Sequence, residues 1–184
     1  MGSVVEVAAL APSADEVQIT VSHTGIEASD IVQMVGGYGT LAGKKPVTEW
    51  DGSLQVGDCG CEGVGVISAV GSGVVDFAVG DAVAFMAASF REVVTIRPRV
   101  ISGATPSVFK IPAATAEWTA VPVSALTATG GLETAGSIQP GQTVLVTGAA
   151  GGTGHIAVQW AKLKGCRVAG TCGDASLQVF PSAT

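Results

Sequence analysis

Charged residues are scarce in this chain, and the basic ones are not concentrated anywhere. Only 13% of the 184 residues are charged, the formal net charge is −6, and the nine Lys and Arg are scattered. A surface that binds nucleic acid or an anionic membrane needs a cluster of basic residues, so we expect neither partner. Hydrophobic residues make up 47% of the chain, which is enough for a globular core.

Long apolar runs are also missing. No segment approaches the roughly 20 apolar residues that a membrane-spanning helix needs, and MGSVVEVAAL carries neither a basic leader nor a cleavage site. A secreted disulfide framework is normally denser, and in a smaller chain, than four cysteines in 184 residues. We therefore expect free thiols and an intracellular protein, most simply a cytoplasmic one, with the peroxisome and the mitochondrion left open.

Up to about residue 118 the chain is a series of short apolar runs separated by turn residues. The segment EVQITVSHTG alternates apolar and polar positions, which is typical of a strand with one buried face. Further runs that favour strands are GVGVISAVGSG, SFREVVTI and FAVGDAVAFMA, the last with a Gly-Asp turn in its middle. Many short strands joined by glycine-rich turns predict a small barrel-like β domain over residues 1–118.

The rest of the chain has the pattern of an α/β protein. Residues 116–136 are rich in Ala, Thr and Leu and favour a helix that the glycines interrupt. After them we predict an apolar strand at Thr143–Thr147, a helix over residues 152–164 and a second strand over residues 166–171. Strand, glycine loop, helix and strand form one βαβ unit. Residues 119–184 are therefore predicted to form an α/β unit with parallel strands.

The predicted helix and its ends carry three more specific expectations. Ile156, Trp160 and Leu163 recur at i, i+4 and i+7, which is the apolar stripe of a helix. Gly165 stands where a helix C-cap needs a left-handed residue. Asp174 is expected to cap the start of another helix.

The glycine loop VTGAAGGTG lies between the predicted strand and helix, where a dinucleotide fingerprint has to be. Ala149, Gly151 and Gly154 match its spacing, with Ala149 in place of the usual first glycine. We expect Gly151 to let the backbone approach a pyrophosphate and Gly154 to let helix and strand pack closely. The amides of Gly152 and Thr153 are expected to point at the phosphates. A structural turn without a ligand is the alternative interpretation.

The end of the second strand bears on which dinucleotide binds. NAD-preferring sites usually have an acidic residue there, which binds the ribose 2′-hydroxyl. Here the strand is expected to end near the neutral Cys172, and Asp174 lies two residues further on. Without an acid to repel a 2′-phosphate, NADP(H) is the expected cofactor, although the basic residue that would bind this phosphate is not evident.

Several separate segments resemble one family. VSHTGIEASDI, GCEGVGVISAVGSGVVDFAVGDAVAFMA, SFREVVTI and PGQTVLVTGAAGGTGHIAVQWAKLKGCRVAGTC are similar to the zinc-independent medium-chain dehydrogenase/reductases. Within that family they resemble quinone oxidoreductases and prostaglandin reductase-3-like enone reductases. The resemblance implies a GroES-like β domain over residues 1–118. It implies that residues 119–184 are the N-terminal portion of a Rossmann coenzyme-binding domain, with its doubly wound parallel sheet. It also implies hydride transfer from NADPH to an enone or quinone substrate, and a homodimer in the full-length form.

The resemblance implies roles for individual residues. GGYG matches a family segment that places Tyr38 beside the nicotinamide and the substrate, where a phenol can stabilise enolate charge; a packing role for this tyrosine is the alternative. SALTA matches the segment before the coenzyme strand, which implies that Thr127 contacts the nicotinamide carboxamide. EASD departs from the family's usual N-A-S-D and places Glu27 where an asparagine near the cofactor is expected.

No metal is expected at the site that the resemblance implies. In zinc-dependent relatives the first ligand falls at Glu27, the histidine ligand falls at Cys61, and the third falls in the apolar residues 121–123. A catalytic zinc needs three protein ligands. The four-cysteine structural lobe of those relatives has no counterpart here either.

Members of the family continue well past the equivalent of residue 184, with further strands of the coenzyme sheet. We therefore expect the sequence to be a fragment or truncated form of an NADPH-dependent enone or quinone reductase. The alternative is a non-catalytic product that acts at most as a binding or regulatory module.

Overall fold

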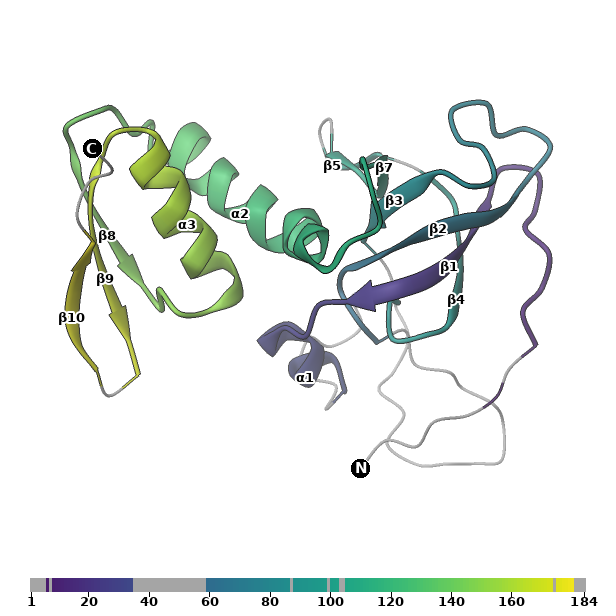
Figure 1. Cartoon of the computed structure of the whole chain (residues 1–184), viewed down its shortest axis with the longest axis horizontal. Helices are drawn as coiled ribbons and strands as arrows, with labels where there is room; N and C mark the ends of the chain where they lie inside the picture. The colour runs from purple at the N-terminus through teal and green to yellow at the C-terminus, as the bar shows by residue number, and fades with distance from the viewer. Residues whose placement is uncertain are drawn as a thin grey trace. The chain divides into compact units, whose positions relative to one another are not determined.

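A computed structural model describes residues 6, 8–34, 59–86, 88–98, 100–102, 105–173 and 175–180 (Figure 1). The chain divides into two compact units, Met1–Thr119 and Ala120–Thr184. Within the described residues, none of the helices combines the length and the apolar character needed to cross a membrane.

The first unit is built on an antiparallel sheet. Its described strands have the order β4-β1-β2-β3-β7, with bounds Val17–Thr24 for β1, Gly63–Val70 for β2, Ala82–Phe85 for β3, Val93–Ile96 for β4 and Val108–Lys110 for β7. A separate ribbon pairs β5 (Val100–Ser102) with β6 (Thr105–Pro106). The helix α1 (Ala28–Met34) follows β1. The strands lie where the alternating and glycine-bounded runs predicted them.

The core of the first unit lies on both faces of this sheet. Successive side chains of a strand point to opposite faces, and β3 shows the consequence. Val83 and Phe85 belong to one buried cluster, and Ala84 between them belongs to another. The first cluster also contains Val17, Ile19, Ile67, Val94 and Val108. The second contains Val64 and Ile111, with Trp118 packed against it.

Helical turns of changing type follow one another from Ala116 to Ala135. They are the 3₁₀ helix η1 (Ala116–Ala120), the π-helix η2 (Val121–Ala125), the α-helix α2 (Leu126–Thr129) and the π-helix η3 (Gly130–Ala135). The prediction that glycines interrupt this helix is wrong at Gly130 and Gly131. Gly130 has φ −59° and ψ −44°, an ordinary right-handed helical conformation, so its freedom to adopt other conformations is not used.

The second unit contains the predicted βαβ arrangement. Strand β8 (Thr143–Thr147) pairs in parallel with β9 (Arg167–Cys172), and α3 (Gly152–Leu163) connects them. Gly165 has φ +77°, which confirms the left-handed residue after the helix. The predicted helix after β9 is wrong, because β10 (Ala175–Phe180) pairs antiparallel with β9. The positive φ of Gly173, +44°, accompanies the reversal of the chain; Asp174 itself lies outside the described residues.

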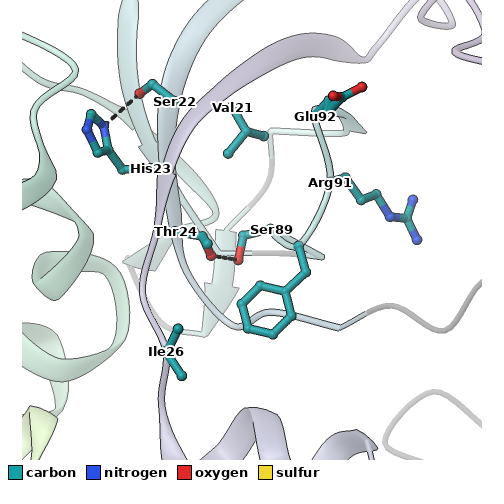
Figure 2. Close-up of a pocket in the computed structure, with 9 residues that line it drawn as sticks. Val21, Ser22, His23, Thr24, Ile26, Ser89, Arg91 and Glu92 are labelled. Carbon is teal, nitrogen blue, oxygen red and sulfur yellow. Dashed lines mark hydrogen bonds between the residues drawn. The ribbon is translucent and has the colours of Figure 1, made fainter. Parts of the chain in front are cut away.

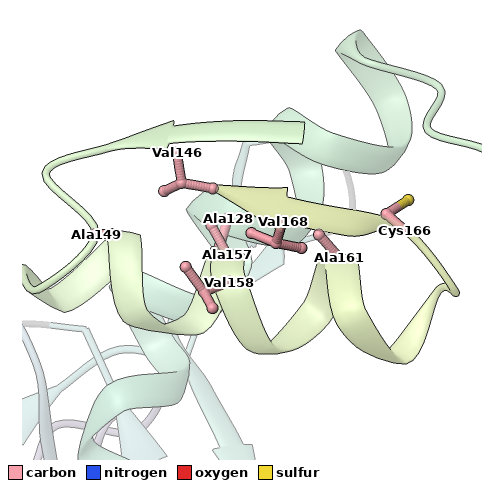
Figure 3. Packing of buried hydrophobic residues seen from close by; sticks show 8 residues of the cluster. All are labelled: Ala128, Val146, Ala149, Ala157, Val158, Ala161, Cys166 and Val168. Carbon is pink, nitrogen blue, oxygen red and sulfur yellow. The ribbon is translucent and has the colours of Figure 1, made fainter. Parts of the chain in front are cut away.

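The core of the second unit lies between the sheet and the helices. Figure 3 shows Val168 of β9 pointing toward Ala157 and Ala161 of α3. Ala128 of α2 belongs to the same cluster, so α2 also packs against α3. The remaining buried members are Val146, Ala149, Val158 and Cys166.

The predicted apolar stripe of α3 is not its buried face. Leu163 is 79% exposed, and Ile156 and Trp160 are only half-buried. The buried face consists of Gly154, Ala157, Val158 and Ala161. Small side chains here let the helix backbone approach the sheet and α2. The face that allows this close approach is buried, although the opposite face has the larger apolar side chains.

Candidate functional site

The loop between β8 and α3 is held in one conformation by backbone contacts. Gly148 has φ +63°, and its carbonyl accepts a hydrogen bond from the Gly151 amide at 2.9 Å. The Ala149 amide donates to the Thr171 carbonyl of β9 at 2.8 Å. Gly148, rather than Ala149, therefore provides the left-handed turn residue, and Ala149 fixes the loop to the neighbouring strand.

Gly154 stands at a point of close approach between α3 and the loop. A Cβ added there would overlap the Gly148 carbonyl oxygen and lie 2.9 Å from the Ala149 Cα. Real Cβ atoms essentially never come so near another heavy atom. A glycine is therefore required at this position for the helix to pack as it does, as the fingerprint predicts for its last glycine.

The first turn of α3 presents backbone amides without a side-chain cap. Gly151 is the N-cap with an extended backbone, φ −79° and ψ 172°, and no side chain accepts from the first turn. The first helical bond runs from the His155 amide to the Gly151 carbonyl, 3.0 Å. The amides of Gly152 and Thr153 precede it and have no acceptor within the helix. Such amides, together with the helix dipole, favour an anion, so the loop fits the pyrophosphate of a dinucleotide.

The other site residues predicted for the coenzyme are less closely tied to the loop. Thr127 is exposed on α2, and its neighbour Ala128 shares the buried cluster with Ala149. β9 ends at the neutral Cys172, as predicted. Tyr38 lies outside the described residues.

In the first unit, Asp30 connects the segments around Glu27 and Cys61. These are the two positions where the resemblance places metal ligands of zinc-dependent relatives. Its carboxylate is buried, with 1% of the residue exposed. One oxygen accepts from the Glu27 amide at 2.6 Å and the other accepts from the Cys61 amide at 2.9 Å. The start of α1 is thereby fixed to the strand-entry segment around Cys61. Sequence reasoning missed this role, although an acidic residue three positions after the residue that precedes a helix is a known capping signal.

The Cys61 thiol is partly buried beside two carboxylates. Burial raises its pKa, and the Asp30 and Glu62 carboxylates raise it further, against the lowering effect of the hydrogen bond with Ser29. The Ser29 Oγ and Cys61 Sγ atoms lie 3.3 Å apart. The raised pKa favours the neutral thiol of Cys61 over the thiolate, which is the reactive form of cysteine. In the part of the chain that the structure describes, no three His, Cys, Asp or Glu residues are grouped so that they could hold a metal ion.

A hollow of about 470 Å³ opens beside the end of β1 (Figure 2). Figure 2 shows the Thr24 and Ser89 hydroxyls bonded to each other, at 2.6 Å, and the Arg91 side chain directed away from them. Thr24 Oγ1 also donates to the Glu62 carbonyl at 3.0 Å. These hydroxyls fix β1 to its neighbours, and we assign no catalytic group here. The lining residues are Val21, Ser22, His23, Thr24, Ile26, Ser89, Phe90, Arg91 and Glu92.

Comparison with known protein families identifies the first unit and the beginning of the second. Residues 13–127 match the model of the alcohol dehydrogenase GroES-like domain, which is more than half of the chain. The chain belongs to the medium-chain dehydrogenase/reductases. This family consists of oxidoreductases, so the resemblance stated from the sequence is confirmed.

Two curated members of the family are similar over most of the chain. Prostaglandin reductase-3 from Bos taurus is 39% identical over 158 residues, which are 85% of this chain and 37% of the relative. A probable quinone oxidoreductase from Leishmania amazonensis is 35% identical over 160 residues, or 86% of this chain and 42% of the relative. The chain thus spans less than half the length of these medium-chain reductases.

Solved structures of the family share the fold. The quinone oxidoreductase of Escherichia coli, crystallised in complex with NADPH, superposes with a TM-score of 0.73 at 29% identity. The superposition covers 93% of this chain and 48% of that one. It confirms the predicted fold class, a GroES-like β domain followed by part of a Rossmann domain.

Proposed function

We propose that the protein is an NADPH-dependent oxidoreductase that transfers a hydride to an enone or a quinone without zinc. The observation that carries this proposal is the glycine loop between β8 and α3. It combines uncapped helix amides with an obligatory glycine at position 154. The loop occurs in a chain that superposes on an NADPH-bound quinone oxidoreductase.

The loop would hold the pyrophosphate of the coenzyme. The amides of Gly152 and Thr153 would donate to its oxygens, and the absence of a side chain at Gly151 would keep the approach to them open. Gly154 and Ala149 act indirectly, because they fix α3 and the loop to the sheet. At the carboxyl end of β9, the neutral Cys172 leaves room for a 2′-phosphate without repelling it, so we propose NADPH rather than NADH.

The remaining roles concern the nicotinamide end and the substrate. When bound, the coenzyme supplies the hydride. Thr127 would orient the nicotinamide through its hydroxyl, and the Tyr38 phenol would donate a hydrogen bond to the substrate carbonyl oxygen on which negative charge develops. Both roles rest on the family resemblance of SALTA and GGYG.

Reduction of this kind needs no metal if hydrogen bonds stabilise the developing charge. The apolar residues 121–123 at the position of the third zinc ligand support a site without zinc, because a catalytic zinc needs three protein ligands. The polypeptide alone would then provide the stabilising groups.

The proposal is tested by coenzyme binding first and turnover second. Purified protein is titrated with NADPH and NADH by coenzyme fluorescence, and then assayed with a panel of enones and quinones before and after chelator treatment. We expect NADPH to bind more tightly than NADH, and any turnover to survive chelation. Loss of turnover that zinc restores would overturn the metal-free mechanism. Failure of NADPH to bind would favour the non-catalytic alternative.

A further inference from the structure

His155 follows the last glycine of the loop and lies in the first turn of α3. Its ring atom Nδ1 lies 3.0 Å from the Gly151 carbonyl oxygen, the same oxygen that accepts from the His155 backbone amide. A carbonyl oxygen only accepts, so the contact requires the hydrogen to be on Nδ1. The ring is thereby held against Gly151, the N-cap residue of the helix.

This contact decides what the other ring nitrogen can do. With Nδ1 donating to Gly151, a neutral His155 has a lone pair on Nε2, which repels an anion. The protonated ring carries a second N–H on Nε2, which donates to an anion with the help of the positive charge. The side chain is exposed, so a proton reaches Nε2 from solvent.

We propose that protonated His155 binds the pyrophosphate of the coenzyme through Nε2, so that binding takes up a proton and weakens as the pH rises. This inference rests on the proposed coenzyme site. It adds a side-chain ligand to a site otherwise made of backbone amides, and it makes coenzyme affinity depend on pH within the range in which histidine titrates, about pH 5 to 8.

Among the described residues, the charged and titratable groups around α3 do not offer a competing explanation. The elements packed against α3 are β8, β9, α2 and η2, together with η3 through a side-chain contact. Of these, β8, α2 and η2 have no titratable side chain. Glu133 of η3 is bound to Trp160 and Lys164, at the far end of α3.

The titratable residues of β9 are Arg167 and Cys172, at opposite ends of the strand. Arg167 is at the amino end, away from the loop. Cys172 is at the loop end. On α3 itself, Lys162 lies in the last turn.

Two substitutions separate charge from hydrogen bonding. H155K carries a permanent positive charge near the same place, and H155Q keeps a neutral donor; both residues suit a helix. We expect wild-type affinity for NADPH to fall about twofold to fivefold between pH 6 and pH 8, the effect of one exposed charge pair. H155K should bind NADPH tightly and H155Q should bind it weakly across this pH range. Neither variant should show the fall in affinity with rising pH that the wild type shows.

NADH provides a second control, because the 2′-phosphate of NADPH also titrates near pH 6. Losing its proton as the pH rises makes NADPH more negative, which would strengthen binding, the opposite of the effect of His155. With NADH this opposing contribution is absent. The fall in affinity from pH 6 to pH 8 should therefore be at least as steep with NADH as with NADPH.

Proton uptake is measured directly by calorimetric titration with NADPH in buffers of different ionisation enthalpy. Wild type should take up more protons than H155Q near neutral pH. NMR gives an independent readout, because the chain has only two histidines, His23 and His155. Inorganic pyrophosphate should raise the titration midpoint of the His155 ring, and leave that of His23, which lies in β1, unchanged. H23Q is the matched control and should keep the wild-type slope.

The outcomes distinguish this inference from the proposed function. NADPH binding with equal pH dependence in wild type and H155Q, and no shift of the His155 midpoint, would overturn the role of His155 while leaving the coenzyme site intact. An absence of NADPH binding at every pH would overturn the site and the inference together. The role of His155 would be supported if the fall in NADPH affinity with rising pH is lost in H155Q and kept in H23Q.

Discussion

The Gly148 carbonyl oxygen occupies the place where a side chain on Gly154 would begin. Because both groups belong to backbone that the sheet and α3 hold in place, neither can move away cheaply. We expect G154A to lower the free energy of unfolding by about 1–3 kcal/mol, typical of overpacking, even though alanine favours a helix by about 1 kcal/mol. Denaturant unfolding measures this. G131A is the matched control, since an added Cβ there meets nothing within 4 Å, and it should be neutral or slightly stabilising.

Gly151 offers the complementary test, because a side chain there should affect binding more than folding. Its extended backbone suits any residue, and an added Cβ would lie 3.3 Å from the Gly148 oxygen, close but not overlapping. We expect G151V to unfold within about 1 kcal/mol of wild type, as most non-core substitutions do, and to bind NADPH at least about tenfold more weakly because its branched side chain blocks the pyrophosphate. Fluorescence titration beside an unfolding curve checks both. Unaltered NADPH affinity would contradict the proposed role of the glycine loop in binding the pyrophosphate.

Asp30 should contribute to stability through the two amides that it accepts from. Replacement by Ala leaves the Glu27 and Cys61 amides without this acceptor, which costs about 1–3 kcal/mol for a buried group. D30N should also destabilise, because its NH₂ group has to face one of the two donors. The exposed Asp76 provides the control D76N, expected within about 0.5 kcal/mol of wild type. Equal unfolding midpoints for D30A and D76N would show that this contact is not stabilising.

The raised pKa of Cys61 predicts slow alkylation. The thiolate is the reactive form, and burial together with the nearby carboxylates keeps the thiol protonated at pH values where an ordinary cysteine has begun to ionise. The iodoacetamide rate at Cys61, followed by mass spectrometry, should therefore reach its midpoint at a higher pH than that of a cysteine in a short peptide. S29A should move the midpoint higher still, because the Ser29 hydrogen bond lowers the pKa. A midpoint below that of the peptide would reverse this account.

The sequence predicted the elements of the second unit better than their packing. The bounds of β8 agree with the predicted strand, and the left-handed Gly165 was expected from the C-cap pattern. The buried face of α3 could not be predicted in this way, because the apolar stripe and the small-residue face of this helix both have helical spacing. Only the neighbours of the helix decide between them, and those come from distant parts of the chain.

The same reason explains what was missed at the candidate site. The glycine spacing indicated the loop and the role of Gly154. It did not show that Gly148 would take the left-handed turn, nor that the ring of His155 would bond to the Gly151 carbonyl. Asp30 reaches Cys61 across 31 positions of sequence, a contact that no local pattern contains. The antiparallel β10 is likewise defined by its pairing with β9.

Self-association through β8 is the last expectation. In the described sheet β8 is an edge strand, and Leu145 in its middle is 61% exposed, next to the buried Val146. An exposed edge with apolar side chains invites pairing with another chain, and a lysine discourages it. We expect L145K to elute later than wild type in size-exclusion chromatography. L163K adds the same charge at another exposed leucine, 79% exposed on α3, and should elute as wild type does. If both variants shift equally, net charge and not the β8 edge governs association.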